Sequence, residues 1–152
     1  MPSFSLNFAP VAAKQIAAVE KALGIKFPSE YKKFLRTING GVPAPNCFTV
    51  PDRGDALCDF LYGICEKRTH GDLEKEQNQV TQLDPLPPGF LVIGHDPGGS
   101  RLLLATIGKD AGQVFFWDRN GFWIRKDGNN TFPITKGFAK FLADLHEMPS
   151  DE

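Results

Sequence analysis

Histidines and cysteines are the side chains of this sequence best able to hold a metal ion, and their spacing does not predict a site. His70, His95 and His146 lie in distant stretches, and none shares a metal-ligand spacing with another histidine or with a cysteine. Only folding could bring them together, so we expect no metal site. The cysteines are odd in number and lack C-x-x-C spacing, which predicts reduced, partly buried thiols: Cys47, Cys58 and Cys65.

The pair His95 and Asp96 could act as a general base, since an imidazole beside a carboxylate can accept a proton. Adjacent residues on an extended strand point to opposite faces, however, and no Ser or Cys occupies a recognisable nucleophile elbow. We therefore expect no enzyme activity and no cofactor. Asp96 is better suited to hydrogen-bond the backbone of the turn that follows it.

The two glycines after Asp96 raise the question of a phosphate cradle. Such cradles use the start of a helix, whereas Gly98 and Gly99 precede a short aliphatic run, residues 100–107, that has the length of a buried strand. The Lys-Ser/Thr pair of a P-loop is also missing. We expect a turn with positive φ angles at both glycines, and a lower stability rather than a lost activity if Asp96 is removed.

Charge is distributed unevenly along the chain. The net charge of -1 argues against general nucleic-acid binding, yet residues 1–49 hold six Lys or Arg against two Asp or Glu, and residues 50–84 hold four against eight. An acidic patch could steer a partner with a basic cleft, and the alternative is ordinary solubilising charge. The candidate binding residues in this middle segment are Asp52, Asp55, Asp59, Glu66, Asp72, Glu74 and Glu76.

The first half of the chain predicts two helices, two strands and a third helix. Apolar residues recur at helical intervals between Pro10 and Gly24, and again from Pro28 to a stop at Asn39–Gly41. Two short runs with alternating side chains, 47–50 and 56–64, predict strands. A polar stretch, 71–83, is weakly helical, with Leu73, Val80 and Leu83 as its buried contacts.

The second half predicts the main sheet. β-rich runs at 90–94, 101–107 and 113–118 have short links, which favours antiparallel pairing, and Asn120–Gly121 predicts a hairpin turn into a fourth strand, 122–125. Trp117 and Trp123 flank that turn, as core pairs or as binding residues. Thr135 is expected to N-cap a last helix, which buries Phe138, Phe141, Leu142 and Leu145.

Helices at both ends and a block of hairpin-linked strands between them predict an α+β fold in a single domain, residues 1–152, with a mainly antiparallel sheet. The N-terminus lacks the pattern of a secretory signal, and no apolar run approaches the length of a membrane span. We expect a cytoplasmic protein, without a membrane partner, that is a monomer or a weak dimer.

Two motif blocks resemble those of the SUKH superfamily, in the branch named after the fungal Smi/Knr cell-wall synthesis regulators. They are "LGIKFPSEYKKFLRTINGG", at residues 23–41, and "LPPGFLVIGHDPGGSRLLLATIGKDAGQVFFWDRNG", at residues 86–121. With the C-terminal "FAKFLADL", the resemblance covers most of the chain. It implies a compact α+β domain and, in bacteria, mostly immunity proteins that bind cognate toxins, often nucleases.

The resemblance implies no enzyme, and its signature residues build the fold rather than a binding site. Fungal members act as regulatory interaction domains. Two hypotheses therefore remain open: a non-catalytic immunity protein that neutralises a toxin, and a regulatory interaction module that acts on an endogenous partner such as the cell-wall synthesis machinery.

Overall fold

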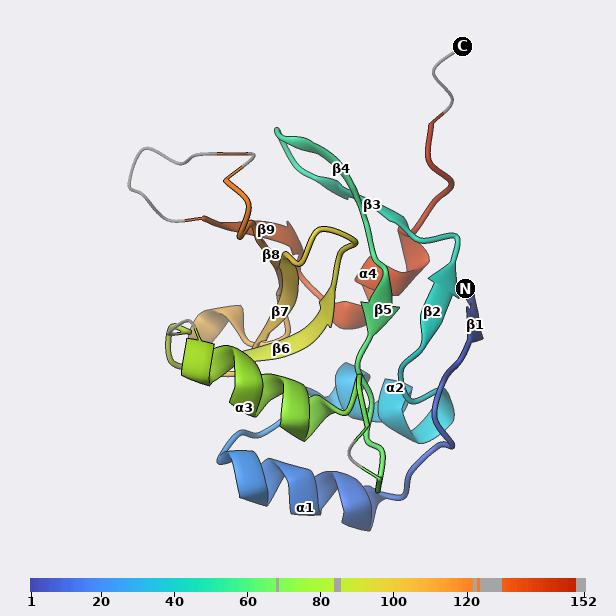
Figure 1. Cartoon of the computed structure of the whole chain (residues 1–152), viewed down its shortest axis with the longest axis vertical. Helices are drawn as coiled ribbons and strands as arrows, with labels where there is room; N and C mark the ends of the chain where they lie inside the picture. Colours follow the sequence, from blue (N-terminus) through green and yellow to red (C-terminus); the bar gives the residue numbers. More distant parts are fainter. Residues whose placement is uncertain (68, 84–85, 122, 124–129, 150–152) are drawn as a thin grey trace.

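The computed structural model describes residues 1–67, 69–83, 86–121, 123 and 130–149. Within these residues the chain has an α+β fold, as predicted: four α-helices, a five-stranded antiparallel sheet and two separate two-stranded ribbons. Helix α1 (Ala13–Leu23) lies at one end of the molecule, and the ribbon of β3 (Cys47–Val50) and β4 (Gly54–Leu57) lies at the other (Figure 1).

The main sheet has the strand order β5-β6-β7-β8-β9, and every neighbouring pair is antiparallel. Its central strands β6 (Phe90–His95), β7 (Arg101–Ala105) and β8 (Val114–Trp117) confirm three of the predicted strands. The aliphatic run in β7 is buried because the strand lies in the middle of the sheet.

The turn between β6 and β7 is built as the sequence predicts, with one difference. Oδ1 of Asp96 accepts hydrogen bonds from the amides of Gly98, at 3.0 Å, and Ser100, at 2.7 Å. Only Gly99 has a positive φ, of 93°, so the expectation for Gly98 was wrong. One residue with a left-handed backbone conformation is enough for this turn, because hydrogen bonds to the Asp96 side chain hold the rest of its backbone.

The last strand of the sheet is β9 (Thr131–Thr135), which pairs with β8. The predicted strand 122–125 lies outside the described residues except for Trp123. Thr135 ends β9 and does not cap the following helix, α4 (Phe138–Ala143), which begins after Gly137. Instead, Oε1 of Glu30 accepts a hydrogen bond from the Ala139 amide at 3.2 Å. Pro133 obscured this strand in the sequence, since proline is confined to particular positions in sheets.

The predicted strand 56–64 is divided between two sheets. Its first residues belong to β4 of the β3–β4 ribbon, named the upper ribbon below, and Phe60–Leu61 form β5 at the edge of the main sheet. The chain crosses between them where the amide of Cys58 donates to Asn46 and the amide of Asp59 donates to the carbonyl of His95. A second short ribbon joins β1 (Ser3–Ser5) to β2 (Val42–Ala44), and the sequence pattern predicts neither strand.

All the predicted helices are present: α1, α2 (Ser29–Thr37), α3 (Leu73–Leu83) and α4. Aromatic residues join α2 to α4, since Tyr31 and Phe34 each place their ring centroid 5.1 Å from that of Phe138. These residues belong to a continuous hydrophobic cluster that extends through the sheet. No described helix has both the length and the apolar character needed to cross a bilayer.

The Asn39–Gly40–Gly41 motif after α2 connects three segments of the fold. The buried Asn39 amide donates to the carbonyls of Ala9 and Ile64, and its oxygen accepts from the Ile64 amide at 2.8 Å. Gly40 has a φ of 83°, and an added Cβ would lie 2.9 Å from the carbonyl oxygen of Leu61. The motif therefore serves to join the N-terminal segment and residues 61–64 closely, as expected of a signature that builds the fold.

Candidate protein-binding surface

A hollow of about 390 Å³ opens between β4, the β6–β7 turn and Trp123. Its lining combines apolar side chains with two carboxylates: Ala56, Leu57, Phe116, Trp123 and Met148, with Asp55 and Asp96. Concave surfaces with an apolar centre and a few polar groups are typical binding sites. We take this region, named the ribbon hollow below, as the candidate functional site.

The wall of the ribbon hollow is held by hydrogen bonds between two turns. Nδ2 of Asn120 donates to the carbonyl of Gly98 at 3.1 Å, and the Arg119 amide donates to Oγ of Ser100 at 3.0 Å. These contacts fix the turn that follows β8 against the β6–β7 turn. The D-x-G-G and W-D-R-N-G motifs are thus used together, on one side of the same hollow.

Asp118 places Trp123 at this surface. The carboxylate of Asp118 is buried, and it accepts hydrogen bonds from the amides of Asn120, at 3.2 Å, and Trp123, at 2.7 Å. The Trp123 ring packs edge-on against Phe116 at 5.6 Å and Phe132 at 5.9 Å. Those contacts confirm the core role for Trp123, and because its side chain is only partly buried, the binding role stays a prediction. Trp117, in contrast, is a core residue.

Four of the candidate acidic residues are exposed, but at different places. Asp52 lies in the β3–β4 turn with a φ of 64°, and Asp55 lies on β4 at the ribbon hollow. Asp59 lies just before β5, where its carboxylate is 3.4 Å from Nε2 of His95. Glu66 lies far from the ribbon, near the start of α1. Asp52 and Asp55 are the two acidic candidates on the upper ribbon.

The other three acidic candidates, Asp72, Glu74 and Glu76, are buried around the start of α3, with relative exposures of 4%, 8% and 5%. Asp72 caps this helix, since its carboxylate accepts hydrogen bonds from the amides of Lys75 and Cys65. Glu76 lies 3.9 Å from Nδ1 of His70. The seven carboxylates therefore do not form one surface patch. The sequence concealed this division because the first turn of α3 is polar yet faces the interior.

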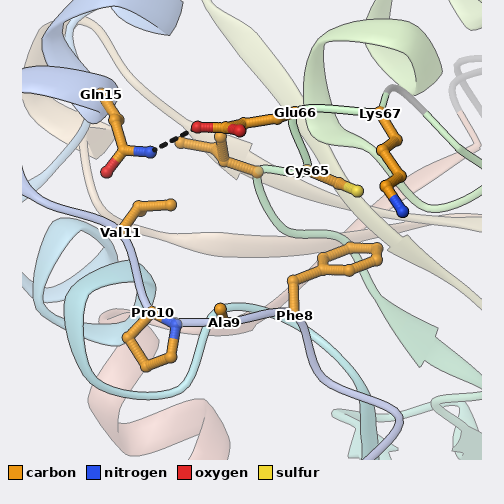
Figure 2. Close-up of a pocket in the computed structure, with 9 residues that line it drawn as sticks. Phe8, Ala9, Pro10, Val11, Gln15, Cys65, Glu66 and Lys67 are labelled. Atoms are coloured by element: carbon orange, nitrogen blue, oxygen red, sulfur yellow. Dashed lines mark hydrogen bonds between the residues drawn. The ribbon is translucent and has the colours of Figure 1, made fainter.

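Glu66 borders a second hollow, of about 460 Å³, between the N-terminal segment, α1 and residues 64–67 (Figure 2). Oε1 of Glu66 accepts a hydrogen bond from Nε2 of Gln15 at 3.4 Å. Cys65 also lines this hollow, and a hydrogen bond from the Thr69 hydroxyl lowers the pKa of its thiol. This hollow offers a thiol among apolar side chains, and its two charged lining residues, Glu66 and Lys67, have opposite signs.

His95 takes part in a polar chain that differs from the pair considered in the sequence. Its Nδ1 lies 2.8 Å from the Tyr62 hydroxyl and its Nε2 lies 3.4 Å from Asp59, whereas Asp96 bonds the turn. Burial, with a further effect from Arg101, lowers the pKa of His95, and burial raises the pKa of Tyr62. A neutral imidazole can thus accept from the tyrosine and donate to the carboxylate. Because Tyr62 is fully buried, this series of polar side chains orders the interior, and the Tyr62 hydroxyl is not an accessible nucleophile.

The fold brings one further set of chemical groups together, which the sequence spacing did not indicate. Cys47, Asp55 and His146 each contribute an atom suited to metal binding, and these three atoms lie within 4.8 Å of one another. The pairing of β3 with β4 explains two members, but the position of His146 depends on where the chain returns after α4. Periodicity and local motifs contain no signal for that return.

Comparison with known proteins agrees with the motif order. A sequence model of the SMI1 / KNR4 family (SUKH-1) matches residues 10–144. The chain is also similar to the SPbeta prophage-derived uncharacterized protein YokK of Bacillus subtilis (strain 168), with 24% identity over 166 aligned positions that cover 97% of this chain and 78% of YokK. The family match includes the helix α2 motif, the Asn39–Gly41 joint and both turns at the ribbon hollow. This chain belongs to the SMI1 / KNR4 family (SUKH-1).

Proposed function

We propose that this protein is a non-catalytic immunity protein that binds a cognate toxin through the ribbon hollow and blocks the toxin's active site or its access to substrate. The observation that carries the proposal is the composition of the hollow, whose lining combines aromatic and aliphatic side chains with two carboxylates. Family membership supports an immunity role, and the similarity to a prophage-derived protein is consistent with it.

The chemistry of the hollow suits a basic partner. A toxin that cleaves nucleic acid carries a cleft for phosphates, and carboxylates on the upper ribbon would attract that cleft during diffusional encounter. Trp123 would then supply the desolvated contact, since partly exposed tryptophans at the centre of an interface contribute much of its binding free energy. A nuclease toxin is therefore the partner class that we favour.

A test uses the product of the gene adjacent to this one as the partner. Copurification of the two proteins from a coexpressing strain supports the immunity role. If that product does not bind and an endogenous cell-wall synthesis protein does, the regulatory role replaces the proposed immunity role.

Variants of the ribbon hollow then locate the interface. Trp123→Ala removes an aromatic contact whose loss costs about 2 kcal/mol, which corresponds to a roughly 30-fold increase in Kd by titration calorimetry. Because Trp123 also packs against the core, Met148→Lys provides a second variant: Met148 is 52% exposed, so the added positive charge acts mainly on the interface, where it repels a basic partner and raises the Kd. Gln15→Ala, at the second hollow, is the matched control. A Kd unchanged in both ribbon-hollow variants would place the interface elsewhere.

A further inference from the structure

We propose that the thiolate of Cys47, the carboxylate of Asp55 and Nε2 of His146 form a three-ligand site for Zn²⁺. Among the described residues, this is the group of histidine, cysteine and acidic side chains whose ligand atoms come close enough together, within 4.8 Å. The proposal is independent of the toxin-binding role, although Asp55 also borders the ribbon hollow.

The backbone fixes two of the ligands relative to each other. Cys47 and His146 form an isolated antiparallel bridge, in which the Cys47 amide donates to His146 at 3.0 Å and the His146 amide donates back at 2.9 Å. A mutual pair of hydrogen bonds of this kind holds the two Cα atoms side by side. The backbone positions of these two ligands are therefore fixed relative to each other.

The third ligand comes from the neighbouring strand. Asp55 pairs with Thr49 across the β3–β4 ribbon, and the Thr49 hydroxyl donates to Oδ1 of Asp55 at 2.6 Å. Oδ1 also lies 3.8 Å from Nε2 of His146. The carboxylate still has lone pairs for a cation, since an ionised carboxylate can accept at about four positions.

The imidazole of His146 is oriented as in known metal sites. Its Nδ1 lies 3.1 Å from the carbonyl oxygen of Asp144. A carbonyl only accepts, so the neutral ring carries its hydrogen on Nδ1 and has its lone pair on Nε2, the nitrogen that faces Asp55. Ligating histidines commonly donate their other nitrogen to a carbonyl or carboxylate in this way.

The donor set selects the metal. Sulfur and imidazole nitrogen favour Zn²⁺ over Mg²⁺ and Ca²⁺, which prefer all-oxygen ligands. Tetrahedral zinc, with bonds of about 2.0–2.3 Å, needs ligand atoms about 3.5 Å apart, so binding would shorten the separations between the ligand atoms by up to about 1 Å. One thiolate and one carboxylate also balance the charge of the ion.

The exposure of the groups allows an ion to enter. Cys47 is buried, whereas the side chains of Asp55 and His146 are 30% and 38% exposed. Solvent thus reaches the oxygen and nitrogen ligands, while the sulfur lies behind them. Three protein ligands leave a fourth position for water.

The test uses the full chain, treated with a chelator and then titrated with Co²⁺, a spectroscopic substitute for Zn²⁺. We expect one ion per chain, a near-ultraviolet band from thiolate-to-cobalt charge transfer, and displacement of Co²⁺ by Zn²⁺. Added Zn²⁺ should also raise the Tm, because an ion that binds only the folded state stabilises it.

Three ligand variants and one control locate the site. Cys47→Ser should remove the charge-transfer band. His146→Gln and Asp55→Asn should each weaken Zn²⁺ binding by at least about 10-fold, the smallest loss typical even for removing a residue that only hydrogen-bonds a ligand. Cys65→Ser should retain the band. If Cys47→Ser does not fold, the partly exposed His146→Gln decides. Absence of the band in the unaltered chain, or its loss in Cys65→Ser with retention in Cys47→Ser, would overturn the proposal.

Discussion

Asn39 shows how one polar side chain can organise a fold. It adopts a left-handed backbone conformation with a φ of 69°, and its buried side chain makes three hydrogen bonds to backbone groups of Ala9 and Ile64. Asparagine tolerates this conformation better than most residues, and its amide can both donate and accept. The residue type is therefore determined by backbone geometry and hydrogen bonding together.

Replacing Asn39 with alanine should lower the free energy of unfolding by about 3 kcal/mol, since each lost bond contributes about 1 kcal/mol and leaves its partner unsatisfied. Urea denaturation provides the measurement. Asn39→Gly restores the backbone freedom without the bonds, so it should recover only a small part of the loss. Asn78→Ala, on the exposed face of α3, should change stability by less than about 0.5 kcal/mol. Equal stability of Asn39→Ala and Asn78→Ala would contradict the prediction.

At the scale of elements, helix α3 shows how a charged sequence can have a structural role. Its first turn contains acidic residues that the composition assigned to a binding patch, but Asp72 instead joins the helix to residue 65 by accepting from both the Lys75 and Cys65 amides. The first amides of a helix lack partners within the helix, and a carboxylate there also interacts favourably with the helix dipole.

Asp72→Ala should therefore destabilise the protein by about 1–2 kcal/mol, as expected for loss of an N-cap, without changing affinity for the toxin. Chemical denaturation and a binding titration of the same sample separate the two effects. Glu66→Ala is the comparison, because Glu66 is an exposed acidic residue in the same segment of sequence. A weakened interaction with the toxin at unaltered stability would restore the surface role of Asp72.

The sequence predicted the elements well where local signals determine them. Helical periodicity located α1 and α2, and the two-glycine turn between β6 and β7 followed from Asp96. Prediction from the sequence failed for β9 and for the division of 56–64 between two sheets, because both depend on which distant strand each residue pairs with. The cluster of Cys47, Asp55 and His146 was missed for the same reason: a contact between residues 47 and 146 has no local pattern.

At the scale of the whole molecule, the rate of association with the proposed partner should depend on where the charges of this protein lie rather than on its net charge. The net charge is only -1, yet Asp52, Asp55 and Asp59 are exposed on or next to the upper ribbon. A local group of like charges can accelerate association even when the total is near neutral, and salt screens that effect over about 10 Å.

Changing Asp52, Asp55 and Asp59 together to lysine should slow association with a basic toxin about tenfold at low salt and reverse or flatten its salt dependence. Stopped-flow kinetics across a range of ionic strength measures both. Asp52→Lys alone should show part of the effect, whereas Asp110→Lys, an equal charge change on an exposed turn after β7, should show little of it. Tm values of all variants verify folding, and identical kinetics in Asp52→Lys and Asp110→Lys would argue against steering by the ribbon.

Strand β9, one of the two edge strands of the main sheet, contains Pro133 at its centre. Proline has no amide hydrogen, so a foreign strand aligned along β9 would meet a gap in the ladder of hydrogen bonds. Proteins commonly protect edge strands against aggregation in this way. A residue that obscured the strand in the sequence thus also discourages copies of this chain from polymerising edge to edge.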